Sequence, residues 1–302
     1  MQKITPSLWF QGQAEEAMNF YLSIFKNSRT VSIKRYPDKP MPGLPMEGLE
    51  GKVLTEIFEL EGQRFMALDG GPIFKFNPSV SFIINCSTTE EVDYYWDKLS
   101  SGGSVLMPIQ KWPFSERYGW LNDTYGVSWQ IGVITSTREK MTPAFMFVGD
   151  NFGKCEEAIN FYTSVFKNSS IEHISRYEKG EHDVEGRVKF SSFKLEDQQF
   201  RAMESSLGHT FNTTGAVSFY IECKDQGEVD YYWDKLTEGG NPQAQQCGWL
   251  QDTYGFSWQI IPKILGELLS DPDKDTSDRV MQAMLKMKKI IVRDLEGAAR
   301  GK

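Results

Sequence analysis

Histidine and cysteine are scarce in this sequence, and their spacing excludes the common metal and disulfide frameworks. The 302 residues include three histidines (His173, His182 and His209) and four cysteines without a CxxC pair. Zinc and iron–sulfur sites need several such residues at short spacing, and disulfide-rich secreted domains need many more cysteines. We therefore expect free cysteines in a reduced, cytoplasmic protein.

Excess basic charge and long apolar runs are lacking as well. The chain has 33 Lys and Arg against 41 Asp and Glu, for a formal net charge of −8. Nucleic acids and anionic membranes attract basic surfaces, so neither is an expected partner. No apolar run approaches the roughly 20 residues that span a bilayer, and the sequence opens on a strand rather than on a signal peptide.

The sequence does contain a strong internal repeat. The segment Gly119–Ile131 (GWLNDTYGVSWQI) returns at Gly248–Ile260 with 11 of 13 residues identical. Each copy has the pattern of a strand, a tight turn and a second strand, and the turn Asp can bond its own backbone. Two other segments also recur, namely 15–28 at 156–169 and 91–99 at 228–236. The chain is therefore a duplication.

Each half repeats one order of elements twice. Alternating and helical spacing of apolar residues predict strands at 4–10 and 79–85, and helices at 14–25 and 89–100. Three strands are expected after each helix, which gives four βαβββ units and an α+β fold class. We expect the first domain at 1–137, the second at 138–262, and a helical C-terminal extension at 263–302.

Four βαβββ units that close on D-x-x-G-x-x-W-Q resemble the vicinal oxygen chelate superfamily, which includes glyoxalase I, bleomycin resistance proteins and extradiol dioxygenases. The segments Thr5–Phe10, Gly119–Leu121 and Ser128–Gln130 further resemble its PhnB-like branch, whose domain is labelled 3-demethylubiquinone-9 3-methyltransferase. The resemblance implies two tandem domains, each with a mixed sheet curled into a U. Helices then lie outside the U and the ligand inside it.

Polar side chains on the strands are the expected ligand contacts. By the resemblance and by strand alternation, the pocket of the first domain is lined by Thr5, Ser7, Trp9, Ser79, Ser81, Ser128 and Gln130. Trp112 and Phe114 lie between strands and have no equivalent in the shorter second half, so we expect them at the pocket mouth. The second domain is expected to have a degenerate pocket, leaving the first domain as the ligand site, with Gln130 as its polar anchor.

The metal positions of the superfamily hold poor ligands in this chain. The resemblance aligns them with Thr5, about Ala67–Asp69, Ser79 and Gln130 in the first half, and with Thr142, about Ala202–Glu204, Ala216 and Gln259 in the second. Hydroxyl and methyl groups do not replace imidazole and carboxylate at a divalent site. We therefore expect no metal and no cofactor. A methyltransferase is not expected either, because the Gly-Gly pairs at 102–103 and 239–240 follow helices instead of opening them.

The leading functional hypothesis is a metal-free small-molecule-binding protein. The alternative is a metal-independent enzyme that uses Asp69 or Glu204, equivalent acids at strand ends, for acid–base chemistry. A solvated loop charge is the competing interpretation of both acids, and a purely structural protein is a third class. One final helix, with the apolar stripe Val280, Met284, Met287, Ile291 and Leu295, is expected to pack on its own domains. A homodimer contact is the alternative for that stripe.

Overall fold

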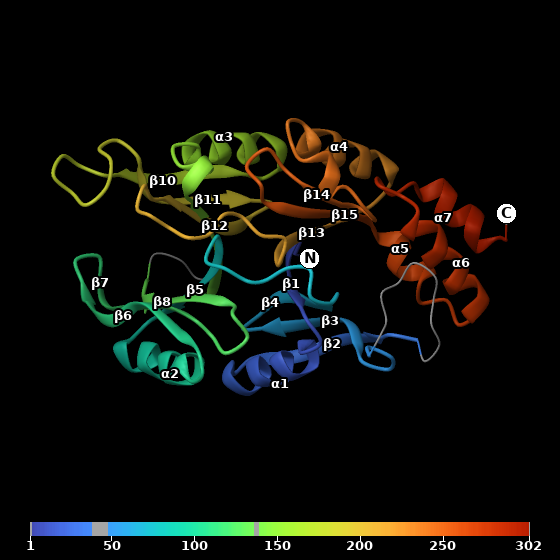
Figure 1. The fold of residues 1–302 in the computed structure, drawn as a ribbon, viewed down its shortest axis with the longest axis horizontal. Helices are drawn as coiled ribbons and strands as arrows, with labels where there is room; N and C mark the ends of the chain where they lie inside the picture. The colour runs from blue at the N-terminus through green and yellow to red at the C-terminus, as the bar shows by residue number, and fades with distance from the viewer. Residues whose placement is uncertain (1, 38–47, 136–138, 302) are drawn as a thin grey trace.

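The computed structural model describes residues 2–37, 48–135 and 139–301, which form two lobes lying one above the other (Figure 1). The first half of the chain makes the lower lobe of that view and the second half makes the upper lobe. The segment 37–52, whose four prolines predict a long loop, lies mostly outside the described residues. Among the described residues, no helix is long and apolar enough to cross a membrane.

The first half folds as two βαβββ units, as the repeat predicts. The first unit comprises β1 (Ile4–Phe10), α1 (Ala14–Ile24), β2 (Ser28–Arg35), β3 (Val53–Leu60) and β4 (Gln63–Asp69). The second comprises β5 (Val80–Cys86), α2 (Thr89–Ser100), β6 (Ser104–Trp112), β7 (Ser115–Asn122) and β8 (Ser128–Val133). The N-cap of α2 is Thr88, whose hydroxyl accepts a hydrogen bond from the Glu91 backbone.

The second half repeats the order with shorter connections, except that only two of the three strands expected after the last helix form. Its third unit comprises β9 (Met141–Phe147), the 3-10 turn η1 (Gly149–Asn151), α3 (Cys155–Val165), β10 (Ser170–Arg176), β11 (Val188–Leu195) and β12 (Gln198–Glu204). Its fourth unit comprises β13 (Val217–Cys223), α4 (Gln226–Thr237), the 3-10 turn η2 (Pro242–Ala244), β14 (Trp249–Gln251) and β15 (Ser257–Pro262).

The strands form two mixed sheets, and each sheet takes one unit from each half. Sheet I has the order β14-β15-β13-β1-β4-β3-β2, and sheet II has the order β10-β11-β12-β9-β5-β8-β7-β6. The halves join where β1 pairs antiparallel with β13, and where β5 pairs antiparallel with β9. The expected tandem α+β fold is confirmed. The pairing corrects one expectation, that the strands of one half enclose one pocket, because β1 and β5 belong to different sheets.

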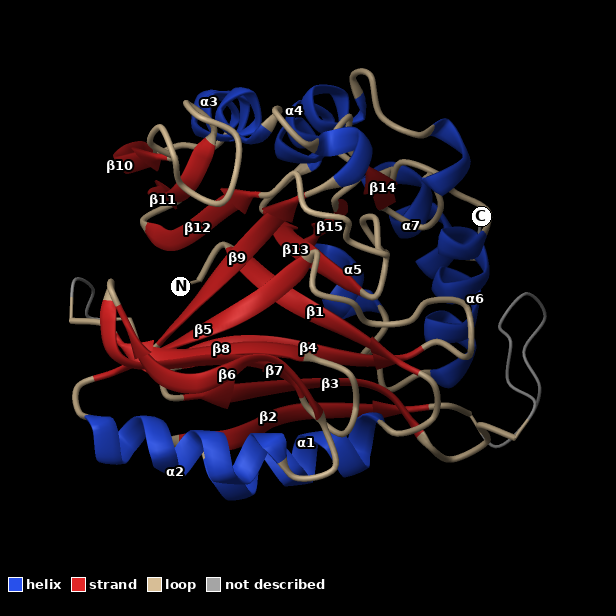
Figure 2. Ribbon diagram, turned by 60° about the vertical axis from the view of Figure 1, so that its left-hand side comes forward, coloured by secondary structure: helices blue, strands red, loops and turns tan. Residues whose placement is uncertain are grey.

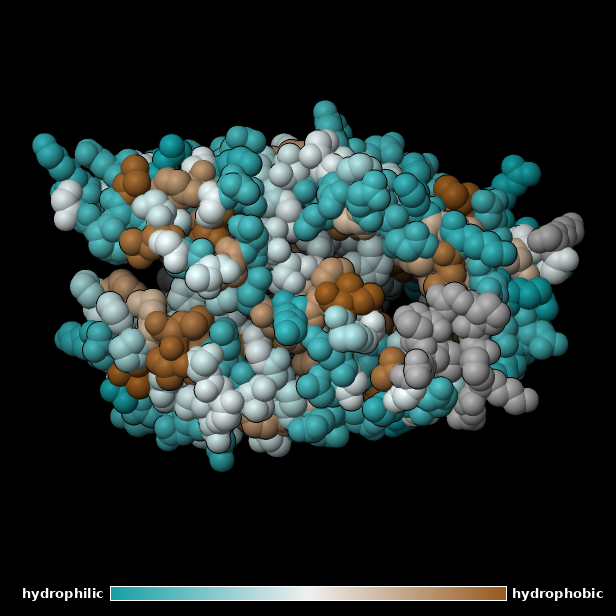
Figure 3. Space-filling view, in the orientation of Figure 1, coloured by the Kyte–Doolittle hydropathy of each residue, from teal (hydrophilic) through white to brown (hydrophobic). Residues whose placement is uncertain are grey.

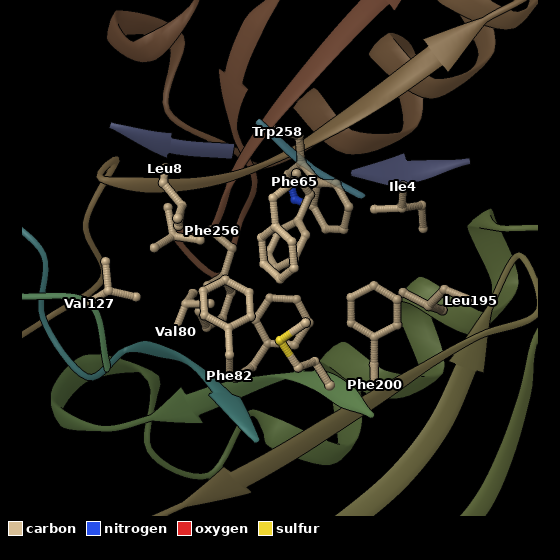
Figure 4. Close-up of a cluster of buried hydrophobic side chains, with 14 of the residues drawn as sticks. Ile4, Leu8, Phe65, Val80, Phe82, Val127, Leu195, Phe200, Phe256 and Trp258 are labelled. Carbon is tan, nitrogen blue, oxygen red and sulfur yellow. The ribbon is translucent and has the colours of Figure 1, made fainter. Parts of the chain in front are cut away.

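Helices cover one face of each sheet and enclose a core that runs through both lobes. In Figure 1, α1 and α2 lie below the strands of the lower lobe, and α3 and α4 lie above those of the upper lobe. Alternate apolar residues of the strands point toward these helices and meet in the centre, where Phe82 and Phe200 approach from different strands (Figure 4). Burying each such side chain contributes about 2 kcal/mol. Trp129 and Trp258 are fully buried on the helix side, as alternation predicts.

The C-terminal extension forms three short helices instead of one long helix. These are α5 (Lys263–Leu268), α6 (Lys274–Leu285) and α7 (Val292–Ala299). The predicted stripe is divided between α6 and α7, because the chain leaves the helix after Leu285. Val280 and Leu295 are buried together with Ile290, so the extension packs on its own chain as expected.

The two sheets open toward opposite ends of the molecule. Sheet I places its edge strands β2 and β14 in different lobes, and the space between them faces α5 to α7 at the right of Figure 1. Sheet II places β6 and β10 in different lobes at the left. Figure 2 shows β6 and β7 curling away from α2 at this end. The fold therefore offers two inner faces, one on each sheet, turned away from the covering helices.

Candidate functional site

The inner face of each sheet carries the polar residues that alternate with the core. On sheet I these positions hold Thr5, Ser7, Trp9, Met66, Ser218, Tyr220 and Gln259, and on sheet II they hold Ser81, Ile83, Ser128, Gln130, Thr142, Ala144, Met146 and Arg201. Of the nine predicted ligand contacts, Thr5, Ser7 and Trp9 lie on sheet I, and the other six lie on or beside sheet II. The structure therefore divides the residues of the predicted pocket between the two sheets.

The C-terminal extension covers part of the inner face of sheet I. Tyr220 and Ile261 point to this face, and both pack against the apolar cluster formed by α5, α6 and α7. The backbone of Cys247 and Gly248, next to edge strand β14, also donates to the carbonyls of Met287 and Lys288, at 2.8 and 2.7 Å. This contact attaches the extension to the open end of sheet I.

The rest of the sheet I face is closed by its own side chains. The Trp9 indole donates to the Gly71 carbonyl (2.8 Å), and its ring meets that of Trp249 edge-on at 5.7 Å. Gln259 donates to the Ser218 hydroxyl at 2.9 Å. Ser7 is 1% exposed, and its hydroxyl has no partner among the described residues. A buried hydroxyl without a partner costs about 1–3 kcal/mol.

A chain of hydrogen bonds fixes the amide of Gln130 on the inner face of sheet II. The Tyr118 hydroxyl donates to Gln130 Oε1 at 2.5 Å, and Gln130 Nε2 donates to the Ser81 hydroxyl at 2.7 Å. These side chains come from β7, β8 and β5. Burial raises the pKa of Tyr118, so it remains a neutral donor at physiological pH. Gln130, the predicted anchor, is thus held in one orientation.

Aromatic residues connect this chain to the surface. The Phe114 ring is 64% exposed and meets Tyr118 edge-on at 5.1 Å, while Trp112 stacks on Phe114 at 6.2 Å. The Trp112 indole donates to the Tyr118 carbonyl at 3.1 Å. Trp112 ends β6 and Phe114 lies in the following turn, which places both near the open end of sheet II. In Figure 3 the surface is hollowed at this left-hand end, between the two lobes.

Apolar side chains line the adjoining part of the sheet II face. Trp120, Met146 and Val148 form a buried cluster, against which Met107, Met203 and Phe211 pack. The Trp120 indole donates to the Ser128 hydroxyl at 2.8 Å, so its polar edge is satisfied and its ring is available for packing. Ser79, the remaining predicted contact, lies next to Met146, and its hydroxyl has no partner among the described residues.

Arg201 is the only charged residue among the positions named above for the sheet II face. It is 3% exposed, and its guanidinium lies 5.3 Å from the Phe190 ring centroid. Within residues 2–37, 48–135 and 139–301, the guanidinium forms no hydrogen bond or ion pair, and the Phe190 ring is its direct contact. Burial lowers the pKa of Arg201, while the carboxylates of Glu172 and Glu139 oppose that effect at longer range.

The two acids considered for catalysis point to the helix side instead of the inner faces. Asp69 is buried and accepts backbone hydrogen bonds from Gly12 (2.8 Å) and Ala14 (3.2 Å), which caps the start of α1. Burial raises the pKa of Asp69, and these bonds oppose the rise. Glu204 accepts from the backbone of Gly153 and Val188, each at 2.6 Å. Both acids are thus engaged in holding backbone, and neither is brought near Gln130.

Metal ligands do not gather within the part of the chain that the structure describes. That part has no group of three or more His, Cys, Asp or Glu residues placed to hold a metal ion. The aligned positions on the two inner faces hold hydroxyl, amide and methyl groups, and the aligned carboxylates of Asp69 and Glu204 point to the helix side, where they accept backbone hydrogen bonds. This donor set does not fit a divalent transition-metal ion.

A separate surface hollow, with a volume of about 460 Å³, lies beside the turn after β7 and is lined in part by Gln13, Lys75 and Thr124. It is open to solvent, and the one carboxylate in its wall belongs to Asp123. That carboxylate already accepts four hydrogen bonds from its own chain. The hollow lies away from the oriented amide of Gln130 and the apolar cluster beside it, so we regard the sheet II face as the candidate site.

Sequence reasoning missed three residues of this site. Tyr118 and Trp120 continue the alternation of strand residues, so the same pattern could have found them, whereas Ala144 was expected in the degenerate pocket of the second domain. Arg201 stands out only when the repeats are aligned, because its equivalent is Met66. In an alignment of the two repeats, a charged residue that replaces an apolar one between two core positions indicates a candidate site residue.

Comparisons with known proteins agree with this architecture. The family described as 3-demethylubiquinone-9 3-methyltransferase matches the chain twice, over residues 2–132 and 139–261. No curated protein matched. A PhnB protein from Bacillus cereus is 46% identical, over 44% of this chain and 100% of its own, with a TM-score of 0.40.

Glyoxalase I from Zea mays is 10% identical over 89% of this chain and 98% of its own, with a TM-score of 0.55. This second likeness is one of fold alone. Together with the two family matches, it confirms the resemblance inferred from the repeated motifs. The chain thus belongs, through both of its halves, to the family described as 3-demethylubiquinone-9 3-methyltransferase.

Proposed function

We propose that this protein binds a small organic molecule on the inner face of sheet II, without a metal ion. The observation that carries the proposal is the amide of Gln130, held between Tyr118 and Ser81 next to an apolar cluster. Ligand sites combine a few oriented polar groups with apolar walls in this way. On sheet I the equivalent Gln259 also donates to a serine, but Cys247 replaces Tyr118 and the C-terminal extension packs against part of the face.

Ala144 lies at the floor of the proposed site. It stands opposite Ser81 on one side and opposite Arg201 on the other, so its methyl group leaves room between them. Its equivalent on sheet I is Ser7, opposite Ser218 and Met66. The two positions therefore offer a matched test of which face binds a ligand.

A thermal-shift screen of metabolites and antibiotics, followed by calorimetric titration, identifies ligands for the test. We expect Ala144→Leu to abolish binding, because the larger side chain fills the floor. Ser7→Leu is expected to leave affinity unchanged, and circular dichroism checks that both variants fold. Binding that survives Ala144→Leu and is lost in Ser7→Leu contradicts the proposed site.

The metal-free part of the proposal has its own test. Purified protein is analysed for zinc, iron, manganese and nickel, and the titration is repeated after dialysis against a chelator. We expect substoichiometric metal and the same affinity before and after chelation. Stoichiometric metal together with chelator-sensitive binding refutes this part.

A further inference from the structure

Arg201 is placed where a ligand on sheet II would meet it. Ala144 stands between Ser81 and Arg201 on three neighbouring strands, and all three positions share the inner face. Neighbouring strands are about 4.8 Å apart, so the Cα atoms of Ser81 and Arg201 are about 10 Å apart. A small molecule lying over Ala144 therefore reaches both the Gln130–Ser81 pair and the guanidinium.

The charge of Arg201 faces the Phe190 ring at 5.3 Å but, among the described residues, has no hydrogen-bond acceptor or carboxylate in direct contact. A guanidinium stays protonated in proteins, and a buried charge is costly unless it is paired or hydrogen-bonded. The two carboxylates that act on it have other partners. Glu172 forms an ion pair with Lys194 at 3.1 Å and accepts from Gln199 Nε2 at 2.8 Å. Glu139 accepts from the Gln199 backbone at 3.1 Å.

The repeat makes this charge specific to sheet II. Met66 occupies the equivalent place on β4 of sheet I, beside the face that the C-terminal extension partly covers. Fold maintenance alone therefore does not require a cation at this position. A buried arginine appears on the inner face of sheet II, and an apolar residue appears at the equivalent place on sheet I.

We propose that Arg201 binds the oxyanion end of the ligand, a carboxylate or a phosphoryl group, while the opposite end contacts Gln130 and the cluster around Trp120. A guanidinium fork matches both oxyanions with paired hydrogen bonds. The inference rests on the proposed function and adds the chemical class of the ligand. It requires an anion that also carries an apolar part, since Met146 and Trp120 adjoin the polar end of the face.

The test compares three probes of similar shape: benzoate, phenyl phosphate and the neutral benzamide. Each is titrated by calorimetry into the full-length protein in low-chloride buffer, because chloride competes for the guanidinium. We expect at least one anion to bind about tenfold or more tightly than benzamide, and the stronger of the two identifies the oxyanion. Added salt should weaken the binding of the anion and leave the binding of benzamide unchanged.

Variants then assign the preference to one residue. Arg201→Met, which installs the sheet I residue, should reduce anion affinity to that of benzamide, while Arg201→Lys should retain part of the preference. Arg176→Met is the control, since Arg176 pairs with Glu156 at the exposed edge strand β10. Thermal unfolding verifies that each variant folds, and the salt dependence of the unmodified protein tests the charge even if Arg201→Met does not fold.

The outcomes separate this inference from the proposed function. Anion preference that persists in Arg201→Met, or no preference for either anion, overturns the inference. If benzamide and the anions bind equally and Ala144→Leu blocks them all, the proposed site stands and the role of Arg201 is refuted. If the anions bind in a way that depends on Arg201 but not on Ala144, the proposed placement of the ligand fails instead. Absence of anion binding at millimolar concentration also counts against the inference.

Discussion

The Tyr21 hydroxyl donates a 2.7 Å hydrogen bond to the buried carboxylate of Asp123, joining α1 to the turn between β7 and β8. The same carboxylate accepts from the Trp129 indole at 2.7 Å and from two backbone amides of the turn. Tyr162 and Asp252 form the identical pair in the second half, also at 2.7 Å. In each half, the repeated motif therefore connects a helix, a turn and a strand. Asp123 and Asp252 were expected only to stabilise their turns, and the structure shows that they also bind a helix and a strand.

Removing one hydroxyl from this arrangement should destabilise the fold. We expect Tyr162→Phe to lower the free energy of unfolding by about 1–3 kcal/mol, because the buried Asp252 carboxylate loses one of its donors. Chemical denaturation of the variant and the parent measures the difference. Tyr231→Phe is a useful comparison, since Tyr231 is 41% exposed and donates to a carbonyl. Equal effects of the two substitutions would contradict the special weight given to the Asp252 site.

Burial raises the pKa of Asp252 from 3.8 to about 6, despite the hydrogen bonds that favour its charged form. Between these values the folded state keeps a proton that the unfolded state has lost, so stability falls as the pH rises. We expect the parent protein to lose about 3 kcal/mol relative to Asp252→Asn between pH 4 and pH 7. Denaturation at several pH values measures this slope, and a difference that does not change with pH rules the assignment out.

Asp69 should behave as a structural residue. Because its carboxylate caps α1, Asp69→Ala is expected to reduce the free energy of unfolding by about 1–2 kcal/mol. The affinity for a ligand found in the screen should not change, since Asp69 points away from the sheet II face. Calorimetric titration of the folded variant decides the point. Lost binding or lost turnover with unchanged stability would restore the acid–base hypothesis.

Gln226 holds the C-terminal extension through both ends of its amide. It donates to the Ile290 carbonyl (3.2 Å) and accepts from the Val292 backbone (2.7 Å). We expect Gln226→Ala to speed proteolytic cleavage between α6 and α7 severalfold, because local opening becomes easier. Gln243→Ala, at an exposed position of η2, is the matched control. Limited proteolysis with mass spectrometry locates the cut, and unchanged cleavage would show that the extension is held elsewhere.

The two repeat-related glutamines should differ in ligand binding. Gln130→Ala is expected to weaken binding by about 1–3 kcal/mol, since it removes the oriented amide of the proposed site. Gln259→Ala should have little effect, because Gln259 lies on sheet I. Trp112→Ala should also weaken binding by about 1–3 kcal/mol if the ligand reaches the mouth. Titrations of the three variants measure this, and a dominant effect of Gln259→Ala would transfer the site to sheet I.

The sequence by itself determined the local structure and the family. Identical segments around Trp129 and Trp258 revealed the duplication, and period-two alternation assigned Ser81 and Gln130 to the face opposite the helices. Such assignments succeed because side-chain direction along a strand depends only on position. The extension was harder, since the apolar stripe through Met284 and Leu295 continues across the break between α6 and α7 and does not reveal it.

Only the tertiary structure decided which strands share a sheet. Strands pair through backbone groups that nearly every residue has, so the sequences of β1 and β5 do not indicate their partners. Those partners are β13 and β9 of the other half. That pairing divides the predicted contacts, with Thr5 on one sheet and Ser81 on the other. It also brings Arg201 of the second half next to Ala144 on the face that holds Gln130 of the first. The site depends on long-range pairing of the two halves, which local patterns of side chains do not encode.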